Sequence, residues 1–175
     1  ERLGVETLRR YADLIAATGE TYLWYFPDGR PSSVEASTSP EATATDGWGS
    51  SAILFGLVEG LAGVTDVDAC FRRIEISPRW AAAEIETARV HMAYAASGAG
   101  VGYVYEQGTD GCRCSLYADG ATVHLHLLLP AGKDLVGMEI GGQRVECART
   151  VVGESVYADA DLTVDGQTIV ELRFT

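Results

Sequence analysis

The sequence has few positive charges. It carries 13 lysine and arginine residues against 25 aspartate and glutamate residues, a formal net charge of −12. A nucleic acid or an anionic membrane surface would repel such a chain. We therefore expect no nucleic acid and no membrane among its partners, and we interpret the acidic surface as a contribution to solubility.

Long apolar runs are also missing. No stretch approaches the ~20 apolar residues that a membrane-spanning helix requires. The chain begins at Glu1 without a basic-then-apolar signal, and its first residues already favour a helix. We expect a piece of a longer protein or a processed chain, so the missing signal says little about its compartment.

Cysteine is scarce, and its spacing matches no metal motif. The four cysteines form no CxxC pair and no Cys/His ligand pattern. Cys112 and Cys114 are two apart in a strand pattern and therefore face the same side. A disulfide remains open, but we favour buried free thiols. The sequence predicts no metal site and no cofactor.

The remaining composition, 47% hydrophobic and 22% charged residues, is typical of a globular protein. Residues 2–18 have the spacing of an amphipathic helix that Gly19 ends. An aromatic cluster follows at residues 21–26, ended by the turn signal Pro27-Asp28-Gly29. Residues 30–45 have no period, and loops of this length are usually functional or disordered.

A second helix is predicted at about residues 50–62. Asp46 or Ser50 can cap its start, and Gly63 can adopt the left-handed conformation that ends it. Its surface combines a broad apolar stripe with small residues such as Gly56, which suits close packing. Two helices joined by a long loop cannot enclose a core, so we expect the last hairpin of a larger helical array.

From Phe71 onward the apolar period is two, with glycine-rich turns at 8 to 12 residue spacing. This pattern is typical of an antiparallel β-sandwich. Asp119-Gly120 and Asp165-Gly166 are predicted turns. The fold class is α+β, mainly β. The predicted core is Phe71, Ile74, Ile76, Val90, Met92, Tyr94, Tyr103, Leu116, Val123, Leu125, Leu127, Ile140 and Val170.

Three stretches carry a family resemblance. They are Trp48-Gly49-Ser50-Ser51-Ala52, Leu61-Ala62-Gly63-Val64 and residues 71–78. Together they resemble the end of a six-hairpin glycoside hydrolase of the α-L-rhamnosidase type, over roughly residues 20–175. The resemblance implies that residues 1–66 are the last helices and active-site-side loop of an (α/α)6 barrel. Residues 67–175 would be its C-terminal antiparallel β-sandwich.

The candidate substrate-binding residues lie near the first loop. Trp24, Tyr25 and Trp48 could stack on the apolar faces of sugar rings, and Asp28 or Asp46 could bind hydroxyl groups. The alternative is that all three aromatic residues belong to the core. The resembled enzymes often have W-E-x-W where this chain has Trp24-Tyr25-Phe26, which places Tyr25 where their carboxylate base stands.

Glycoside hydrolysis requires two carboxyl groups about 5 to 10 Å apart. Asp28, Glu35, Glu41 and Asp46 offer acids, but no spacing selects a pair, so the catalytic residues stay unknown. The resemblance places the second acid upstream of this chain. We therefore expect the chain alone to be inactive, with the N-terminal remainder of the same enzyme and an oligosaccharide or glycoside as partners.

His124 and His126 alternate on one strand face, which makes a two-histidine metal site conceivable. It would need further ligands, and His91 is the only other histidine. We favour structural histidines.

Two functions remain open. The chain is either the C-terminal part of a carbohydrate-active enzyme or a non-catalytic carbohydrate-binding or structural β-sandwich module. In the enzyme, residues 20–47 should line an acidic cleft. In the binding module, aromatic residues should line an open sheet face.

Overall fold

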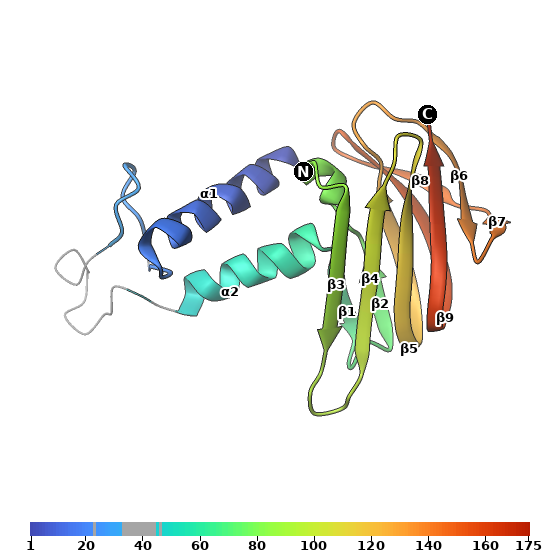
Figure 1. Cartoon of the computed structure of the whole chain (residues 1–175), viewed down its shortest axis with the longest axis horizontal. Helices are drawn as coiled ribbons and strands as arrows, with labels where there is room; N and C mark the ends of the chain where they lie inside the picture. Colours follow the sequence, from blue (N-terminus) through green and yellow to red (C-terminus); the bar gives the residue numbers. More distant parts are fainter. Residues whose placement is uncertain (23, 33–44, 46) are drawn as a thin grey trace. The chain divides into compact units, whose positions relative to one another are not determined.

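The computed structural model of the chain describes residues 1–22, 24–32, 45 and 47–175 (Figure 1). Residues 2–60 form one compact unit, and residues 61–175 together with Glu1 form another. Glu35, Glu41 and Asp46, named above as candidate acids, lie outside the described residues.

The first helix forms where the sequence predicts it. Helix α1 runs over Arg2–Thr18. The N–H of Gly19 donates to the carbonyl oxygen of Ile15 at 2.7 Å, and Gly19 has a φ of 77°. A left-handed glycine at this position ends a helix by satisfying one of its last carbonyl groups. The prediction for this element is confirmed.

The second helix starts earlier than predicted and changes its winding. Helix α2 covers Gly47–Phe55, and the π-helical segment η1 continues over Gly56–Leu61. Ser50 therefore lies inside the helix and does not cap it. A Cβ atom at Gly49 would lie 2.2 Å from the Tyr11 hydroxyl oxygen, and one at Gly56 would lie 2.7 Å from Leu8 Cδ2. The missing side chains let α1 approach this helix closely, as the small residues predict.

In the part that the structure describes, the helical unit has almost no core of its own. Among its described residues, Val5 and Ser32 are the buried ones. The apolar side chains of Leu3, Leu54 and Phe55 are exposed. This agrees with the expectation that two helices and a loop cannot bury their apolar surface alone.

The second unit is a mixed sheet of nine strands in which β1, β2, β5, β9, β6 and β7 are neighbours in that order. Strands β3 and β4 extend it from β5, and β8 pairs with β9. The strands are β1 (Val64–Asp68), β2 (Arg73–Ile76), β3 (Thr87–Ala93), β4 (Gly100–Gln107), β5 (Gly111–Leu128), β6 (Leu135–Ile140), β7 (Gln143–Val145), β8 (Ala148–Val152) and β9 (Ser155–Phe174). A short 3-10 helix, η2 (Trp80–Ala83), precedes β3. The mainly β class is confirmed.

Two long strands organise this sheet. β5 and β9 pair antiparallel from Gly111 opposite Arg173 to Leu128 opposite Tyr157. β4 and β6 flank one half of this ribbon, while β2 and β8 flank the other half. All nine strands therefore belong to one hydrogen-bonded sheet (Figure 1).

The predicted turns at Asp119-Gly120 and Asp165-Gly166 are wrong. Ala118 pairs with Gly166 and Ala121 with Val164, so two residues of β5 oppose one residue of β9. This is a β-bulge, in which Gly120 takes a φ of 71° while the strand continues. Aspartate-glycine has the same local preference in a turn and in a bulge. Here β5 pairs with β9 on both sides of Asp119-Gly120, so the two residues form a bulge and the chain does not reverse.

The bulge also keeps the apolar side of β5 inside. The buried residues of the strand are Cys112, Cys114, Leu116 and Ala118, then Ala121, Val123, Leu125 and Leu127, with Leu128 at the end of the strand. Side chains alternate between the faces of a strand with period two, so the extra residue shifts the inward set from even to odd numbers. The even-numbered side chains of the second half lie on the opposite face of the strand, where Thr122 is exposed, His124 and His126 are half-buried and Leu128 is buried.

The prediction of a purely antiparallel β domain is wrong for one pair of strands. β2 runs parallel to β5, with Ile74 opposite Val123. The connection between them contains η2, β3 and β4, and a connection of that length does not impose antiparallel pairing as a short turn does. Strand β1, antiparallel to β2, was also missed because Asp66 and Asp68 interrupt its apolar pattern.

The core agrees with most of the prediction. Val90, Met92 and Ile140 pack partly buried against it, and the other predicted residues except Tyr94 are buried. Tyr94 is exposed, which corrects the prediction. It lies just beyond β3, where its hydroxyl group donates to Asp66 Oδ2 at 2.8 Å.

All four cysteines are free thiols. Cys112 and Cys114 are buried on the same side, as predicted, and the hydrogen bond with Cys112, together with burial, raises the pKa of Cys114. Cys70 is exposed. Across the described residues, no helix has the length and apolar character needed to cross a membrane.

Candidate functional site

A small hairpin positions the predicted aromatic residues. The N–H of Ser32 donates to the Trp24 carbonyl oxygen at 2.9 Å, and the N–H of Phe26 donates to that of Arg30 at 2.8 Å. Its tip is a turn closed by the Gly29 N–H and the Phe26 carbonyl oxygen at 2.8 Å. Gly29 has a φ of 83°, a conformation that glycine adopts readily. The predicted turn at residues 27–29 is therefore confirmed.

The aromatic side chains form two edge-to-face groups. Trp24 and Phe26 have ring centroids 4.4 Å apart. Tyr25 contacts Tyr11 of α1 at 6.0 Å and Tyr22 at 5.8 Å. Such geometries are the favoured ones for aromatic pairs. Trp24 and Tyr25 are half-buried, so each ring keeps part of its surface in solvent.

The carboxylate of Asp28, in the turn of this hairpin, accepts two hydrogen bonds from Arg30. The backbone N–H of Arg30 lies 3.1 Å from Oδ1, and Nε of the same arginine lies 2.7 Å from Oδ2. These two hydrogen bonds lower the pKa of Asp28. The guanidinium carbon of Arg30 also lies 5.1 Å from the centroid of the Phe26 ring, so one arginine joins the carboxylate to the aromatic group.

Trp48 lies at the start of α2 with 79% of its surface exposed. It is therefore not a core residue of the described chain. An indole ring of this exposure presents a large apolar surface to solvent.

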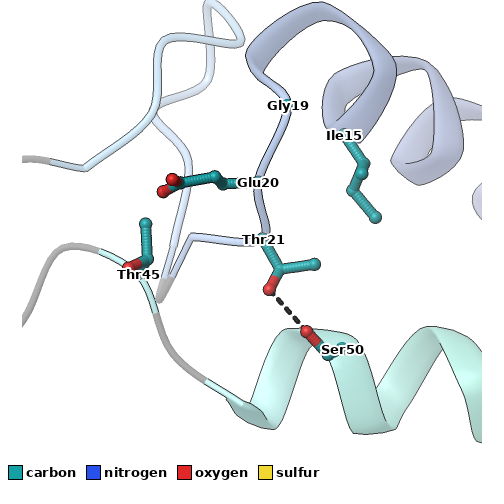
Figure 2. Close-up of a pocket in the computed structure, with 6 residues that line it drawn as sticks. All are labelled: Ile15, Gly19, Glu20, Thr21, Thr45 and Ser50. Carbon is teal, nitrogen blue, oxygen red and sulfur yellow. Dashed lines mark hydrogen bonds between the residues drawn. The ribbon is translucent and has the colours of Figure 1, made fainter.

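A pocket of about 450 Å³ opens where the end of α1 meets α2 (Figure 2). It is lined by Ile15, Gly19, Glu20, Thr21, Thr45 and Ser50. Thr21 and Ser50 point toward one another, with their hydroxyl oxygens 2.7 Å apart, and either can be the donor. Its size is that of a small-molecule site, and the hydroxyl groups of Thr21, Thr45 and Ser50 and the carboxylate of Glu20 can exchange hydrogen bonds with a polyol.

The structure brings together only part of the predicted site. Trp24, Tyr25 and Asp28 share the hairpin, but neither they nor Trp48 line the pocket, and Asp46 lies outside the described residues. The pocket residues Glu20, Thr21 and Ser50 were not among the substrate-binding residues predicted from the sequence. Thr21 and Ser50 are 29 positions apart, and such a separation leaves no motif to find.

No protein-family model and no curated protein matches the sequence. Among solved structures, the chain is similar to the α-L-rhamnosidase from Dictyoglumus thermophilum, with a TM-score of 0.53 and 12% identity over 79% of this chain. It spans only 15% of the length of that enzyme. At this identity the likeness shows the fold alone.

Two further neighbours have lower scores. One is a GH127 β-L-arabinofuranosidase from Geobacillus Stearothermophilus T6, with a TM-score of 0.43 and 13% identity over 73% of this chain and 18% of that one. The other is described as a glycoside hydrolase, with a TM-score of 0.37 and 16% identity over 51% of this chain and 15% of that one. All three structures are glycoside hydrolases, and this chain spans 15 to 18% of their lengths.

Proposed function

We propose that this chain is the C-terminal part of a glycoside hydrolase of the α-L-rhamnosidase type. Residues 1–66 complete an (α/α)6 barrel, and residues 67–175 form the β domain that braces it. The observation that carries the proposal is the fold likeness, which covers 79% of this chain but 15% of the rhamnosidase. A fragment from one end of a larger enzyme accounts for this asymmetry.

The helical unit supports the same proposal. Its exposed Leu54 and Phe55, and the small number of buried side chains among its described residues, indicate apolar surface that another part of the protein covers. The partner is the N-terminal remainder of the same enzyme, whose helices pack against α1 and α2.

In this proposal, the sugar binds to residues in and around the loop of the helical unit, residues 20–47. Trp24, Tyr25 and Trp48 stack on sugar rings, while Asp28 and Asp46 accept hydrogen bonds from hydroxyl groups. The lowered pKa of Asp28 suits an acceptor that stays ionised, because a general acid requires a raised pKa to hold its proton at neutral pH. Asp28 is therefore not the catalytic acid in this proposal. The resemblance puts an acid upstream of this chain, so we expect the chain alone to hydrolyse no glycoside.

The non-catalytic sugar-binding module has weaker support. That reading expects aromatic residues along an open sheet face. In residues 61–175 the exposed aromatic side chains are Tyr94 and Tyr117, and the hydroxyl of each donates to a carboxylate, of Asp66 and Asp119 respectively. The observations favour the enzyme fragment.

The deciding experiment extends the chain upstream. The reading frame before Glu1 is translated, and the longer protein is tested on a panel of aryl glycosides that includes an α-L-rhamnoside. We expect a run of helical hairpins upstream, activity only in the longer protein, and a raised KM in its Trp24→Ala and Trp48→Ala variants. Tyr117→Ala, an exposed aromatic residue of the β unit, is the matched control and should leave KM unchanged.

Two results contradict the proposal. If the upstream sequence contains no helical hairpins, residues 1–66 cannot complete an (α/α)6 barrel. Hydrolysis by the 175-residue chain alone, abolished by Asp28→Asn, shows that the chain contains a complete active site.

A further inference from the structure

The outer face of the β unit carries a cluster of histidines and aspartates. The bulge in β5 turns His124 and His126 outward in the second half of that strand. In the paired strand β9, Asp161 lies directly opposite His124 and Asp159 directly opposite His126. Two imidazoles and two carboxylates thus share one surface, although they come from positions more than 30 residues apart in the sequence.

The cluster is tight enough for a shared ion. Nδ1 of His126 lies 2.6 Å from Oδ1 of Asp159, and Nδ1 of His124 lies 2.8 Å from Oδ1 of Asp161, so each histidine forms a hydrogen bond with its opposite aspartate. An ion bound through Nδ1 of His126 and Oδ1 of Asp159 would replace the hydrogen bond between them. One ligand atom each from His124, His126 and Asp159 falls within 4.8 Å of the other two. Asp159 is the third ligand that the histidine pattern lacked in the sequence.

Neighbouring side chains hold two of these groups in place. Thr150 Oγ1 of β8 donates to Oδ2 of Asp159 at 2.5 Å, so the other oxygen, Oδ1, is the one that faces His126. The ring of Tyr157 stacks on His126 with centroids 3.8 Å apart and planes 10° apart. Outer partners of this kind fix the orientation of metal ligands and strengthen binding.

The exposure and charge of the cluster suit a cation. The side chains of His126 and Asp159 are each 17% exposed, whereas that of His124 is 44% exposed. An ion would therefore be partly desolvated yet reachable from solvent. Asp161 and Glu75, which lies beside His124 in the register of β2, add negative charge around it.

We propose that His124, His126 and Asp159 bind a divalent transition-metal ion of the Zn²⁺ class. Two imidazoles and one carboxylate form a ligand set that zinc accepts, with a fourth position left for water or another ligand. Asp161 lies at hydrogen-bond distance from His124 and orients its ring. The proposal concerns the β unit alone and does not depend on the glycosidase assignment.

Zn²⁺ titration of the 175-residue chain by calorimetry tests it. The wild type should bind one Zn²⁺ per chain, and His126→Asn and Asp159→Asn should each weaken binding by about 100-fold or more, since they remove a ligand. Thr150→Val should weaken it by about 10-fold, the size typical of an outer partner. His91→Asn, an exposed histidine of β3, is the matched control and should bind like the wild type.

Far-UV circular dichroism of each variant separates lost binding from lost folding. If His126→Asn does not fold, His124→Asn, which changes the more exposed of the two histidines, carries the test. Co²⁺ is the spectroscopic probe, and nitrogen and oxygen ligands should give only weak visible bands. Strong near-ultraviolet thiolate absorption would assign the ion to a cysteine and overturn the site. The same conclusion follows if the wild type binds no Zn²⁺, or if the ligand variants bind it as the wild type does.

Discussion

The hydroxyl group of Tyr103 donates a hydrogen bond to the carbonyl oxygen of Ala62 at 2.5 Å. The same oxygen of Tyr103 accepts from Nε1 of Trp80 at 2.8 Å. Tyr103 is buried in β4, and Ala62 stands just before Gly63, where the helical segment gives way to β1. One buried hydroxyl thus joins the start of the β unit to its central strands.

We expect Tyr103→Phe to lower the free energy of unfolding by about 1 to 3 kcal/mol, because it leaves the Ala62 carbonyl and the Trp80 N–H without this partner. Urea denaturation measures the loss. Tyr117→Phe is the control, since this exposed tyrosine should change stability by no more than about 0.5 kcal/mol. Equal effects of the two changes would show that the buried bond adds nothing.

The β unit should lose stability at high pH. Burial raises the pKa of Tyr103 and of Tyr105 above the ordinary value of 10. Unfolded tyrosine therefore releases its proton first, so stability is complete below pH 10 and falls as the pH rises toward the folded-state pKa. The slope is up to about 1.4 kcal/mol per pH unit for Tyr103. Ultraviolet titration should show both tyrosines ionising only as the protein unfolds, and ionisation of every tyrosine near pH 10 in a folded chain would contradict this.

Gly63→Ala should be among the most damaging single changes. Gly63 has a φ of 65°, and a Cβ atom there would lie 1.8 Å from the Ser77 carbonyl oxygen. Strain and a backbone clash together should cost about 3 kcal/mol or more. Gly60→Ala is the control, because a Cβ atom at Gly60 would meet nothing within 4 Å, and it should be neutral or stabilising. Thermal melts compare the two variants, and equal melting temperatures would refute the prediction.

Trp48→Ala should leave stability within about 1 kcal/mol of the wild type, as expected at an exposed position. Trp80→Ala should cost about 3 kcal/mol, because Trp80 packs on the β core and loses its bond to Tyr103. Melts with and without oligosaccharide in the longer protein then isolate the ligand contribution of Trp48. A large loss of melting temperature with unchanged affinity would make Trp48 structural.

The 175-residue chain by itself should self-associate or aggregate. Leu3, Leu54 and Phe55 are exposed on the helical unit, and apolar surface of this kind is seldom left in water. Analytical ultracentrifugation should show species larger than the monomer, and Leu54→Gln with Phe55→Gln should shift them toward the monomer. A monomeric wild type that binds no apolar dye would count against an absent partner.

Local features of this protein could be predicted from the sequence. The extent of α1 and the turn at residues 27–29 both depend on residues close together in the chain. Helical period, strand alternation and glycine at turns express local backbone preferences, so the neighbouring residues alone determine them.

Only the tertiary structure decided which distant segments meet. Asp119-Gly120 became a bulge because β5 and β9 pair on both sides of it, and β2 became parallel to β5 because a long connection left its direction free. The same pairing places Asp159 opposite His126 and so completes a cluster that histidine spacing alone left open. Contacts between residues far apart in the chain depend on register and packing, and these leave no local pattern in the sequence.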